Sequence, residues 1–296
     1  MKNKYCFTAV MLTVVALCAG IFAGICRMEQ SSSEKEPFLA VTSFYPVYIA
    51  AANVIGDCPG IRLENLSEPQ TGCLHDFQMT PEDMKLLSLA DVFLVNGGGM
   101  ESFLTDTAAE YPDLPIVETA GDLVLPDGNA HAWMSIKCYR QMTAKITESL
   151  CSLFPDYEKE LKRNGAEYDA KLARLEEEQQ EIADAAKGKK IISFHEAYEY
   201  LAEDYGLEIC YTLNLDEERQ VSAGEVADVL AAAKKNQADM IFAEELYGKE
   251  LSDTIKKETE IEVYYPDTLV RGEYDLDAYI SRMQDNINLL KKAFGV

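Results

Sequence analysis

One long charged stretch divides the chain into two halves and constrains the fold more than any other feature. It runs from Tyr157 to about Lys187 and carries apolar residues at the spacing of one helix face, namely Leu161, Tyr168, Leu172, Leu175 and Ile182. A helix of roughly 30 residues rises about 45 Å, which is too long for a helix packed on one small sheet. We therefore expect a rigid connecting helix over residues 157–187, with one lobe on each side of it.

Short apolar segments alternate with longer helical ones on both sides of this connector. The expected strands are Phe38–Ser43, Ile61–Leu66 and Val92–Asn96 in the first half, and Lys190–Phe194, Glu208–Leu213, Met240–Ala243 and Glu262–Tyr265 in the second. This alternation predicts an α/β fold in which each lobe is a small, mainly parallel sheet flanked by helices. We place the N-terminal lobe at residues 38–156 and the C-terminal lobe at residues 188–296. Parallel sheets bind ligands at the carboxyl ends of their strands, so a cleft between the lobes is the expected binding place.

Two helix starts are marked by their capping residues. Thr80 precedes Pro81 and two acidic residues, a combination typical of a helix N-terminus. Ser222 and Glu225 form a capping-box pattern ahead of the helical segment Val226–Asn236. Other expected helices are Val47–Ile55, Ser135–Phe154, Glu196–Tyr205 and Asp275–Phe294.

The first 25 residues have the pattern of an export signal, because two lysines precede an apolar run from Phe7 to Ile25. Cleavage before Cys26 would produce a lipoprotein, cleavage after Gly20 would release the chain, and an uncleaved run would itself be an anchor. Residues 26–37 are polar and serine-rich, which predicts a flexible tether. All three alternatives place the mature domain outside the cytoplasm, anchored to the membrane, secreted or periplasmic.

Charge and cysteine content exclude several classes of site. Acidic side chains number 51 and basic ones 27, so the protein should repel nucleic acid. Cys58 and Cys73 flank a short turn-rich stretch and are the best candidates for a disulfide. Cys138 and Cys151 lie on one expected helix, about 20 Å apart along its axis, and cannot bond to each other. No Cys-x-x-Cys motif occurs, which argues against cysteine ligation of a metal.

Three histidines carry the strongest functional signal, since His75, His131 and His195 are the only ones in the chain. Each lies in a loop or at a strand end, and none lies on an apolar helix stripe. One such histidine alone would usually be a structural or surface residue, but three in similar positions indicate a shared purpose. Imidazole is the commonest metal ligand and suits zinc and other transition metals, so we predict a metal site formed by these three residues.

A tetrahedral site with three histidines needs one more ligand, either a carboxylate or a water. Asp267 is the first candidate, because it follows an expected strand of the second half and so resembles His195 in position. The alternative interpretation is a turn residue, because the preceding proline makes a Pro-Asp pair that is common in turns. Glu244, just after the strand Met240–Ala243, is the second candidate.

These residues fall in segments that together resemble one known family. Over about Phe38 to Phe294 the sequence is similar to the metal-binding lipoproteins that serve zinc and manganese ABC importers, the cluster A-I (cluster 9) solute-binding proteins. The segments that carry the resemblance are Val41-Thr-Ser-Phe-Tyr-Pro46, Leu74-His75-Asp76 with Thr80-Pro81, His131-Ala-Trp133, Phe194-His195-Glu-Ala-Tyr198 with Tyr205-Gly206-Leu207, Ile241-Phe-Ala-Glu244 and Asp267-Thr-Leu269.

The resemblance implies two α/β lobes joined by one long helix, with a metal site completed by an aspartate at position 267. It also implies an extracytoplasmic, membrane-tethered protein that delivers a divalent metal ion to an ABC permease. We expect a monomer. Two departures from the family pattern stand out: Thr268 follows Asp267 where proline is frequent, and no histidine occurs in Glu101–Ala130, so an accessory histidine-rich loop is absent.

The ligand set also bears on the choice of metal. Manganese members of the family commonly have glutamate at the third histidine position, whereas this chain has His195. Three imidazole nitrogens with a carboxylate favour Zn²⁺ by ligand softness. Mn²⁺ is the alternative, because a bidentate Asp267 would raise the coordination number.

Two other functions are alternatives to transport. A zinc hydrolase also uses three histidines and a water, but Glu199 stands where a His-Glu-x-x-His motif starting at His195 needs its second histidine. We therefore expect no enzymatic activity and no catalytic residues. A surface adhesin or structural lipoprotein of the same fold, acting in cell adhesion, remains a second alternative.

Overall fold

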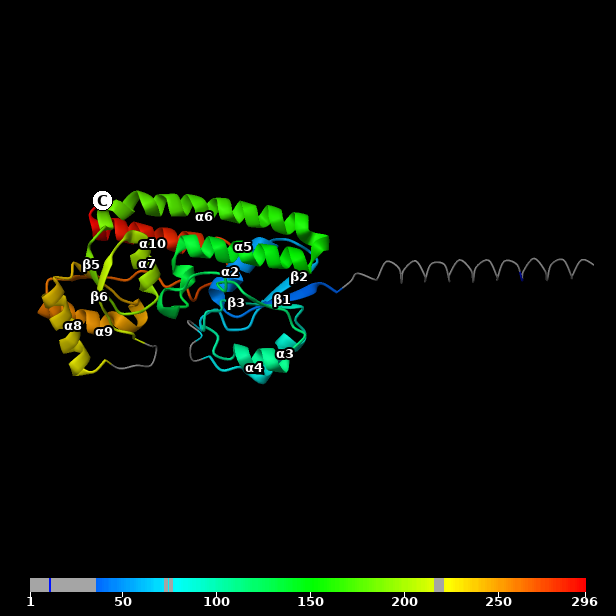
Figure 1. The fold of residues 1–296 in the computed structure, drawn as a ribbon, viewed down its shortest axis with the longest axis horizontal. Coiled ribbons are helices and arrows are strands. Elements are labelled where there is room, and N and C mark those ends of the chain that lie inside the picture. Colours follow the sequence, from blue (N-terminus) through cyan, green and yellow to red (C-terminus); the bar gives the residue numbers. More distant parts are fainter. Residues whose placement is uncertain (1–10, 12–35, 72–73, 75–76, 216–220) are drawn as a thin grey trace, which may run out of the picture. The chain divides into compact units, whose positions relative to one another are not determined.

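The computed structural model describes residues 11, 36–71, 74, 77–215 and 221–296, with the backbone alone at 246–250. Phe38–Val296 forms one compact unit, separate from Met1–Pro37 (Figure 1). The expected signal at 1–25 and most of the expected tether at 26–37 lie outside the described residues. No helix among the described residues combines the length and apolarity needed to cross a bilayer.

Two four-stranded sheets with the same connectivity form the framework of this unit. The first has the strand order β2-β1-β3-β4 and the second has the order β6-β5-β7-β8, and all neighbouring strands are parallel. The strands are β1 Phe38–Thr42, β2 Ile61–Asn65, β3 Val92–Val95, β4 Ile116–Glu118, β5 Lys190–Ser193, β6 Glu208–Thr212, β7 Met240–Phe242 and β8 Glu262–Tyr264. The fold class expected from the sequence is therefore confirmed.

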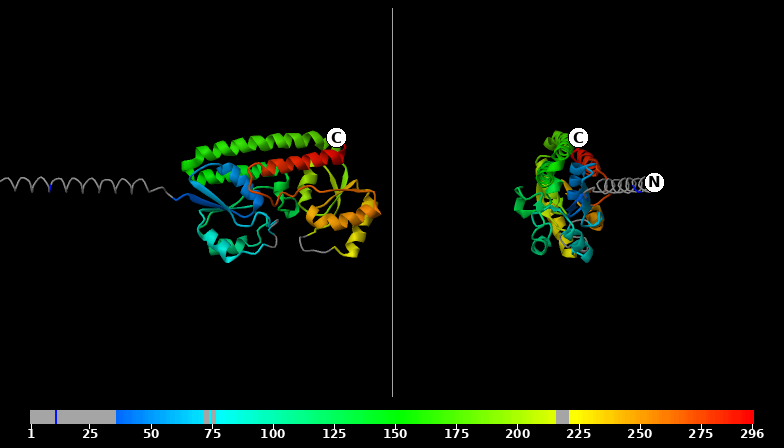
Figure 2. Two further views of the ribbon diagram at one scale, coloured as in Figure 1. Left: turned by 180° about the vertical axis from the view of Figure 1, so that it is seen from behind. Right: turned by 90° about the vertical axis from the view of Figure 1, so that its right-hand side faces the viewer.

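The helices cover both faces of the sheets. Figures 1 and 2 show α6 and α10 side by side along one side of both sheets, with α5 beneath them, whereas α3, α4, α8 and α9 lie on the opposite side. The helices are α2 Tyr45–Ile55, α3 Pro81–Ser88, α4 Leu104–Glu110, α5 Ile136–Leu153, α6 Glu158–Ala186, α7 Tyr198–Tyr205, α8 Ala223–Asn236, α9 Glu245–Glu258 and α10 Ala278–Phe294.

The two sheets repeat one detail of side-chain bonding. Asp91, just before β3, accepts the backbone N–H of Leu39 at 2.7 Å, and Asp239, just before β7, accepts that of Lys190 at 2.7 Å. Each aspartate thus ties the start of a central strand to its neighbour. All four residues of β3 are buried, as a strand covered by helices on both faces requires.

The long connector is the single helix α6 of 29 residues. Its buried face includes the apolar stripe expected from the sequence, and this face belongs to a hydrophobic core that also contains residues of both lobes, such as Val92, Tyr139 and Ile191. The connector is therefore packed along its length and holds the lobes through a shared core.

Two elements were not expected from the sequence, the short strand β4 and the helix α9. Two expected helices begin later than predicted. The helix expected from Glu196 begins at Tyr198, because the preceding residues form a turn in which the N–H of Ala197 donates to Nδ1 of His195. The last helix begins at Ala278 rather than Asp275.

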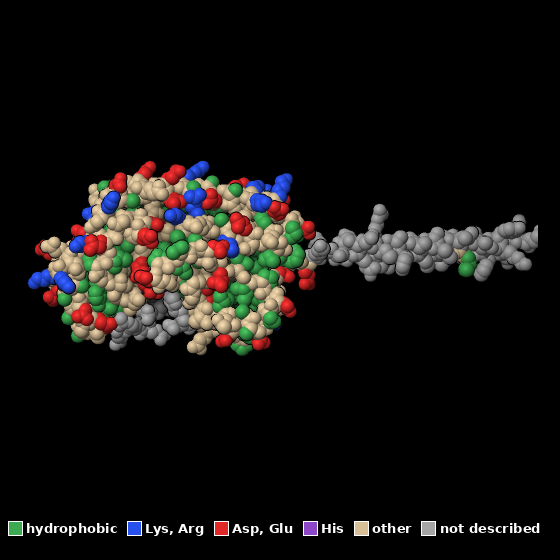
Figure 3. Space-filling model, in the orientation of Figure 1, with side chains coloured by type: hydrophobic (Ala, Val, Ile, Leu, Met, Phe, Trp, Pro, Cys, Tyr) green, Lys and Arg blue, Asp and Glu red, His purple; other side chains and the backbone are tan. Residues whose placement is uncertain are grey.

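The described cysteines are unpaired, and charged side chains are spread over the surface. Cys58 is a buried free thiol, while its expected partner Cys73 lies outside the described residues. Cys138, Cys151 and Cys210 are also free. On the face shown in Figure 3, acidic side chains are spread over both lobes and basic ones gather mainly at the upper edge and left end. That face therefore has no continuous basic surface of the kind that nucleic acid requires.

Candidate metal centre

In each sheet the strand order reverses between the two central strands, which are β1 and β3 in the first sheet and β5 and β7 in the second. The residues that directly follow these four strands lie at the switch points. Parallel sheets bind ligands beside such a switch point, at the carboxyl ends of the strands. In the second sheet, His195 comes shortly after β5 and Glu244 shortly after β7. In the first sheet, Ser43 and Asn96 hold the equivalent positions after β1 and β3.

His131 is fully buried between two short 3-10 turns, Pro126–Gly128 and Ala132–Met134. Its ring centroid lies 5.1 Å from that of Trp133. Oδ1 of Asn129 lies 2.8 Å from Nδ1 of His131 and also accepts the backbone N–H of His131 at 3.0 Å. A neutral imidazole that donates its Nδ1 proton to an amide oxygen presents its lone pair at Nε2, the arrangement typical of metal-binding histidines.

His195 approaches His131 from the other lobe. The two ring centroids lie 5.0 Å apart and the rings are nearly perpendicular, at 89°. Nδ1 of His195 accepts the backbone N–H of Ala197 at 2.9 Å, and the hydroxyl of Ser193 bonds to the backbone of the same histidine. The structure thus brings together two of the three predicted histidines, one from each lobe.

The third predicted histidine, His75, lies outside the described residues. The adjacent Leu74 is fully buried, and the helix that follows begins at the expected N-cap Thr80, which forms a capping box with Asp83. Within the described ranges, no three His, Cys, Asp or Glu side chains are close enough to share a metal ion. The complete ligand set therefore stays a prediction.

Asp267 follows β8, and its carboxylate bonds to Arg282 on α10. The N–H of Leu269 also donates to Oδ1 of Asp267 at 2.8 Å, so this carboxylate forms the turn described by the alternative interpretation. Asp267 lines a cavity of about 230 Å³ together with Glu244, Arg271 and Arg282. Both predicted carboxylate candidates thus face the same space.

The buried hydroxyl of Tyr198 contacts the carbonyls of the residues that precede the two carboxylates, Ala243 and Pro266. The ring of Tyr198 lies 6.5 Å from that of His195, and its hydroxyl donates to the carbonyl of Pro266 at 2.7 Å. Burial raises the pKa of the Tyr198 hydroxyl well above its ordinary range, and the charges of Glu244 and Asp267 raise it further. Tyr198 therefore stays protonated and acts as a hydrogen-bond donor.

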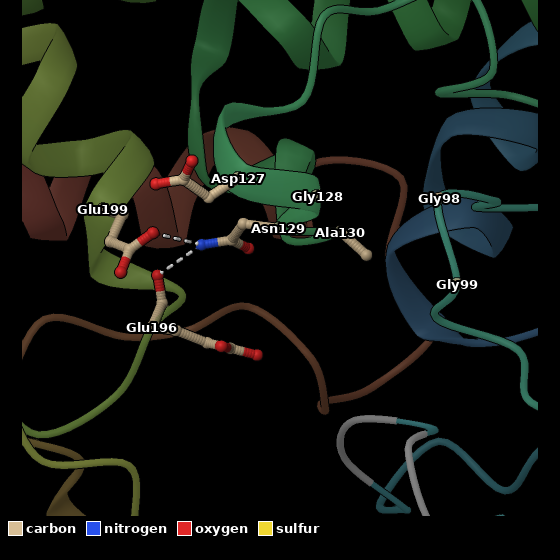
Figure 4. Close-up of a pocket in the computed structure, with 8 residues that line it drawn as sticks. All are labelled: Gly98, Gly99, Asp127, Gly128, Asn129, Ala130, Glu196 and Glu199. Atoms are coloured by element: carbon tan, nitrogen blue, oxygen red, sulfur yellow. Dashed lines mark hydrogen bonds between the residues drawn. The ribbon is translucent and has the colours of Figure 1, made fainter.

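Asn129 joins the two lobes beside His131. Figure 4 shows its amide nitrogen bonded to the carbonyl of Glu196 and to the carboxylate of Glu199, both at 2.9 Å. These residues and Asp127 line a second cavity of about 230 Å³. The Glu196 carboxylate also lies 3.7 Å from Nδ1 of His131. Sequence reasoning missed Asn129, although its position two residues before a predicted ligand was a usable signal.

A buried carboxyl group, that of Glu101, connects the site loops to the first sheet. It accepts hydrogen bonds from the Ser43 hydroxyl at 2.7 Å, from the N–H of Asn96 at 2.8 Å and from the N–H of Gly97 at 3.0 Å. Burial raises the pKa of Glu101, although these bonds oppose the rise. The Asn96 side chain in turn donates to the carbonyl of the residue before His131. This network holds the His131 loop against the sheet.

Comparison with known families gives a match over nearly the whole compact unit. The family model described as "ZnuA: Zinc-uptake complex component A periplasmic" matches residues 40–293. The zinc-binding lipoprotein AdcA of Streptococcus pneumoniae serotype 4 is 28% identical over 96% of this chain, and this chain spans only 60% of the length of AdcA. The iron-binding protein YfeA of Yersinia pestis is 26% identical over 100% of this chain and 98% of its own.

A solved structure of similar sequence has the same fold. The Zn(II)-bound ZnuA-like domain of Streptococcus pneumoniae AdcA superposes with a TM-score of 0.76 at 27% identity, and the match covers 88% of this chain and 100% of that domain. The arrangement of two lobes and a connecting helix is therefore shared with a zinc-bound protein.

Proposed function

Because the chain belongs to the ZnuA family of periplasmic zinc-uptake components, we propose that it is the solute-binding protein of an ABC importer for a divalent transition metal. It captures the ion between its lobes and hands it to the membrane permease. The observation that carries this proposal is the 5.0 Å approach of the His131 and His195 rings from opposite lobes. This family consists of solute-binding components and not of enzymes, so no catalytic role is assigned.

The proposed ligands are His75, His131, His195 and Asp267. Two of them, His131 and His195, already face each other, and Asp267 lies on a loop held by Tyr198, whose ring packs near His195. Glu244 is the second carboxylate candidate because it lines the same cavity as Asp267. Zn²⁺ is the first choice of cargo and Mn²⁺ the second, because three nitrogen ligands and one carboxylate are softer than the oxygen-rich sites that Mn²⁺ prefers.

The protein acts outside the cytoplasm, as the family description implies. We further propose that it is a monomer held at the membrane through a lipid on Cys26, with residues 26–37 as the tether. An acidic domain on such a tether can collect cations near the membrane and present them to the permease. The low basic content also argues against a nucleic-acid partner.

Calorimetric titration of the metal-stripped protein with Zn²⁺ and with Mn²⁺ tests this function. Wild-type protein should bind one ion per chain, whereas His131→Ala and His195→Ala should each lose at least about a hundredfold in affinity, because each removes a ligand from one lobe. Gln141→Ala, on the exposed face of α5, is the control and should bind like wild type.

Wild-type affinity in both histidine variants would contradict the proposal, as would a wild-type protein that binds neither ion. Gene deletion separates transport from the adhesin alternative. Loss of zinc or manganese uptake supports transport, whereas normal uptake with reduced surface attachment supports adhesion.

A further inference from the structure

The carboxylate of Asp267 already has a cationic partner in the structure. Nε of Arg282 donates to Oδ2 at 2.7 Å and Nη2 donates to Oδ1 at 2.7 Å, which makes a bidentate pair. The guanidinium also donates to the carbonyl of Arg271 and lies over the ring of Tyr45 at 5.8 Å. Bidentate arginine–carboxylate pairs are the strongest class of charge-assisted hydrogen bond.

The backbone on both sides of Asp267 is fixed next to the histidine pair. The Tyr198 hydroxyl donates to the carbonyl of Pro266 at 2.7 Å, and Nε1 of Trp133 donates to the carbonyl of Thr268 at 2.9 Å. The rings of these two aromatic residues lie 6.5 Å and 5.1 Å from the rings of His195 and His131, respectively. The backbone next to Asp267 is thus held by two aromatic residues whose rings lie near the two histidines.

Helix α10 holds the backbone and the side chain of Asp267 through two different residues. Oδ1 of Asn286 accepts the N–H of Asp267 at 2.7 Å, and Nδ2 of Asn286 donates to its carbonyl at 2.8 Å. Arg282 lies one helical turn before Asn286, and its bonds to Asp267 go to the carboxylate and not to the backbone. A rotation of the Asp267 side chain would therefore break the Arg282 bonds and the bond from the Leu269 N–H, and would leave the Asn286 bonds to the Asp267 backbone intact.

We propose that Arg282 competes with the cargo metal for Asp267. This inference rests on the proposed function and adds a positioning residue to its site. Arg282 holds the carboxylate before the ion binds, and the ion takes it over by a rotation of the Asp267 side chain. When the ion leaves, the carboxylate rotates back to the guanidinium, so the Asp267 charge is not left unpaired beside Glu244, which lines the same cavity. Arg282 therefore lowers the affinity for the metal and speeds its release.

The Arg282→Gln variant tests this competition, because it keeps a hydrogen-bond donor and removes the charge. The readout is the rate at which Zn²⁺ passes from the loaded protein to an excess of chelator. Loss of charge-assisted bonds to a carboxylate should slow release and tighten binding by about tenfold to a hundredfold. Arg282→Lys restores the charge without the bidentate geometry and should lie between this variant and wild type.

An Asp267→Asn background distinguishes competition from a purely structural effect. Asp267→Asn alone should weaken Zn²⁺ binding, and adding Arg282→Gln in that background should change the release rate less than twofold. Faster or unchanged release in Arg282→Gln would overturn the inference, and so would wild-type affinity in Asp267→Asn. Thermal unfolding of each variant shows whether it is folded. If Arg282→Gln does not fold, the release rate of Arg282→Lys still tests the competition.

These outcomes are distinct from failure of the proposed function. If wild-type protein binds Zn²⁺ through its histidines but the release rate does not depend on Arg282, only the competition is wrong. If wild-type protein binds no metal, the proposed function itself is wrong.

Discussion

At the residue scale, Asn129 illustrates how one side chain serves both the fold and the site. Its oxygen accepts from the ring of His131, and its nitrogen donates across the lobes to Glu196 and Glu199. The hydroxyl of Tyr200 donates to its carbonyl at 2.6 Å. The contacts of the side chain to His131 and to the two glutamates need an amide with its oxygen toward the histidine, whereas the Tyr200 bond goes to the backbone. Asn129 therefore orients the ring that we propose as a metal ligand.

We predict that Asn129→Ala weakens Zn²⁺ binding by about tenfold to a hundredfold, because partners that orient a ligand histidine typically contribute that much to metal affinity. Isothermal titration of the purified variant measures the effect. Asn236→Ala, which removes an asparagine from α8 that bonds only its own helix, is the matched control. Equal affinities in both variants and wild type would show that Asn129 does not orient His131.

At the element scale, the connecting helix contains an Asn-Gly pair, which is unfavourable within a helix by propensity alone. Its contacts with neighbouring helices explain its presence there. Nδ2 of Asn164 donates to the carbonyls of Val54 and Ile55, the last residues of α2. Gly165 faces α5 so closely that an added Cβ would lie 2.5 Å from Oγ1 of Thr147. The pair therefore fastens α6 to two neighbouring helices, at the cost of some helix propensity.

We predict that Gly165→Ala lowers the free energy of unfolding by about 1–2 kcal/mol. Overpacking against α5 costs roughly 1–3 kcal/mol, and better helix propensity recovers up to about 1 kcal/mol. Urea unfolding followed by circular dichroism measures the change. The Thr147 hydroxyl bonds to Thr143 and cannot simply rotate away. Combining Gly165→Ala with Thr147→Ala should therefore remove the clash, so the double variant should be more stable than the sum of the two single effects predicts. A double variant whose stability equals that sum would contradict the clash.

Secondary structure was predictable where the pattern was local and strong. The helix start at Thr80 and the capping box at Ser222 were predicted from the sequence and are formed, and the apolar stripe of the connector predicted α6. The strand Ile116–Glu118 was missed because it is short and carries no fully buried residue, so its conformation comes from pairing with β3. The helix Glu245–Glu258 was missed because its sequence is mostly polar, so its position depends on packing against β8 and α8.

At the scale of the whole molecule, the two lobes are connected by more than the long helix. Asp204 on α7 accepts from the hydroxyl of Ser135, just before α5, and from Nε2 of Gln179 on α6, both at 3.1 Å. Burial raises the pKa of Asp204 to about 6, although both hydrogen bonds oppose the rise. A half-buried carboxylate with few neutralising partners thus lies where three helices from both lobes meet.

This raised pKa predicts a pH-dependent stability. Between pH 3.8 and about 6 the folded chain holds the Asp204 proton and the unfolded chain does not, so the free energy of unfolding falls as pH rises through this window. The full effect is roughly 3 kcal/mol, absent below the window and complete above it. Urea unfolding should show wild type losing up to about this much relative to Asp204→Asn between pH 4 and pH 7.

Asp113→Asn, at an exposed position after α4, is the control for this comparison. Its stability relative to wild type should change little between the two pH values. A difference between wild type and Asp204→Asn that is the same at both pH values would contradict the assignment of a buried, protonated Asp204.

The repeated alternation of strands and helices, the long connector and the positions of His131 and His195 at a loop and a strand end were all readable in the chain, because each depends on residues near one another in sequence. The pairing of Asp267 with Arg282 and the bridge made by Asn129 were not, and the predicted meeting of His131 with His195 is seen only in the folded molecule. These contacts join residues 15 to 70 positions apart, and no local pattern encodes which distant side chains share a space. Packing of two lobes on one core brings them together, so the partners of each candidate ligand are a property of the folded molecule.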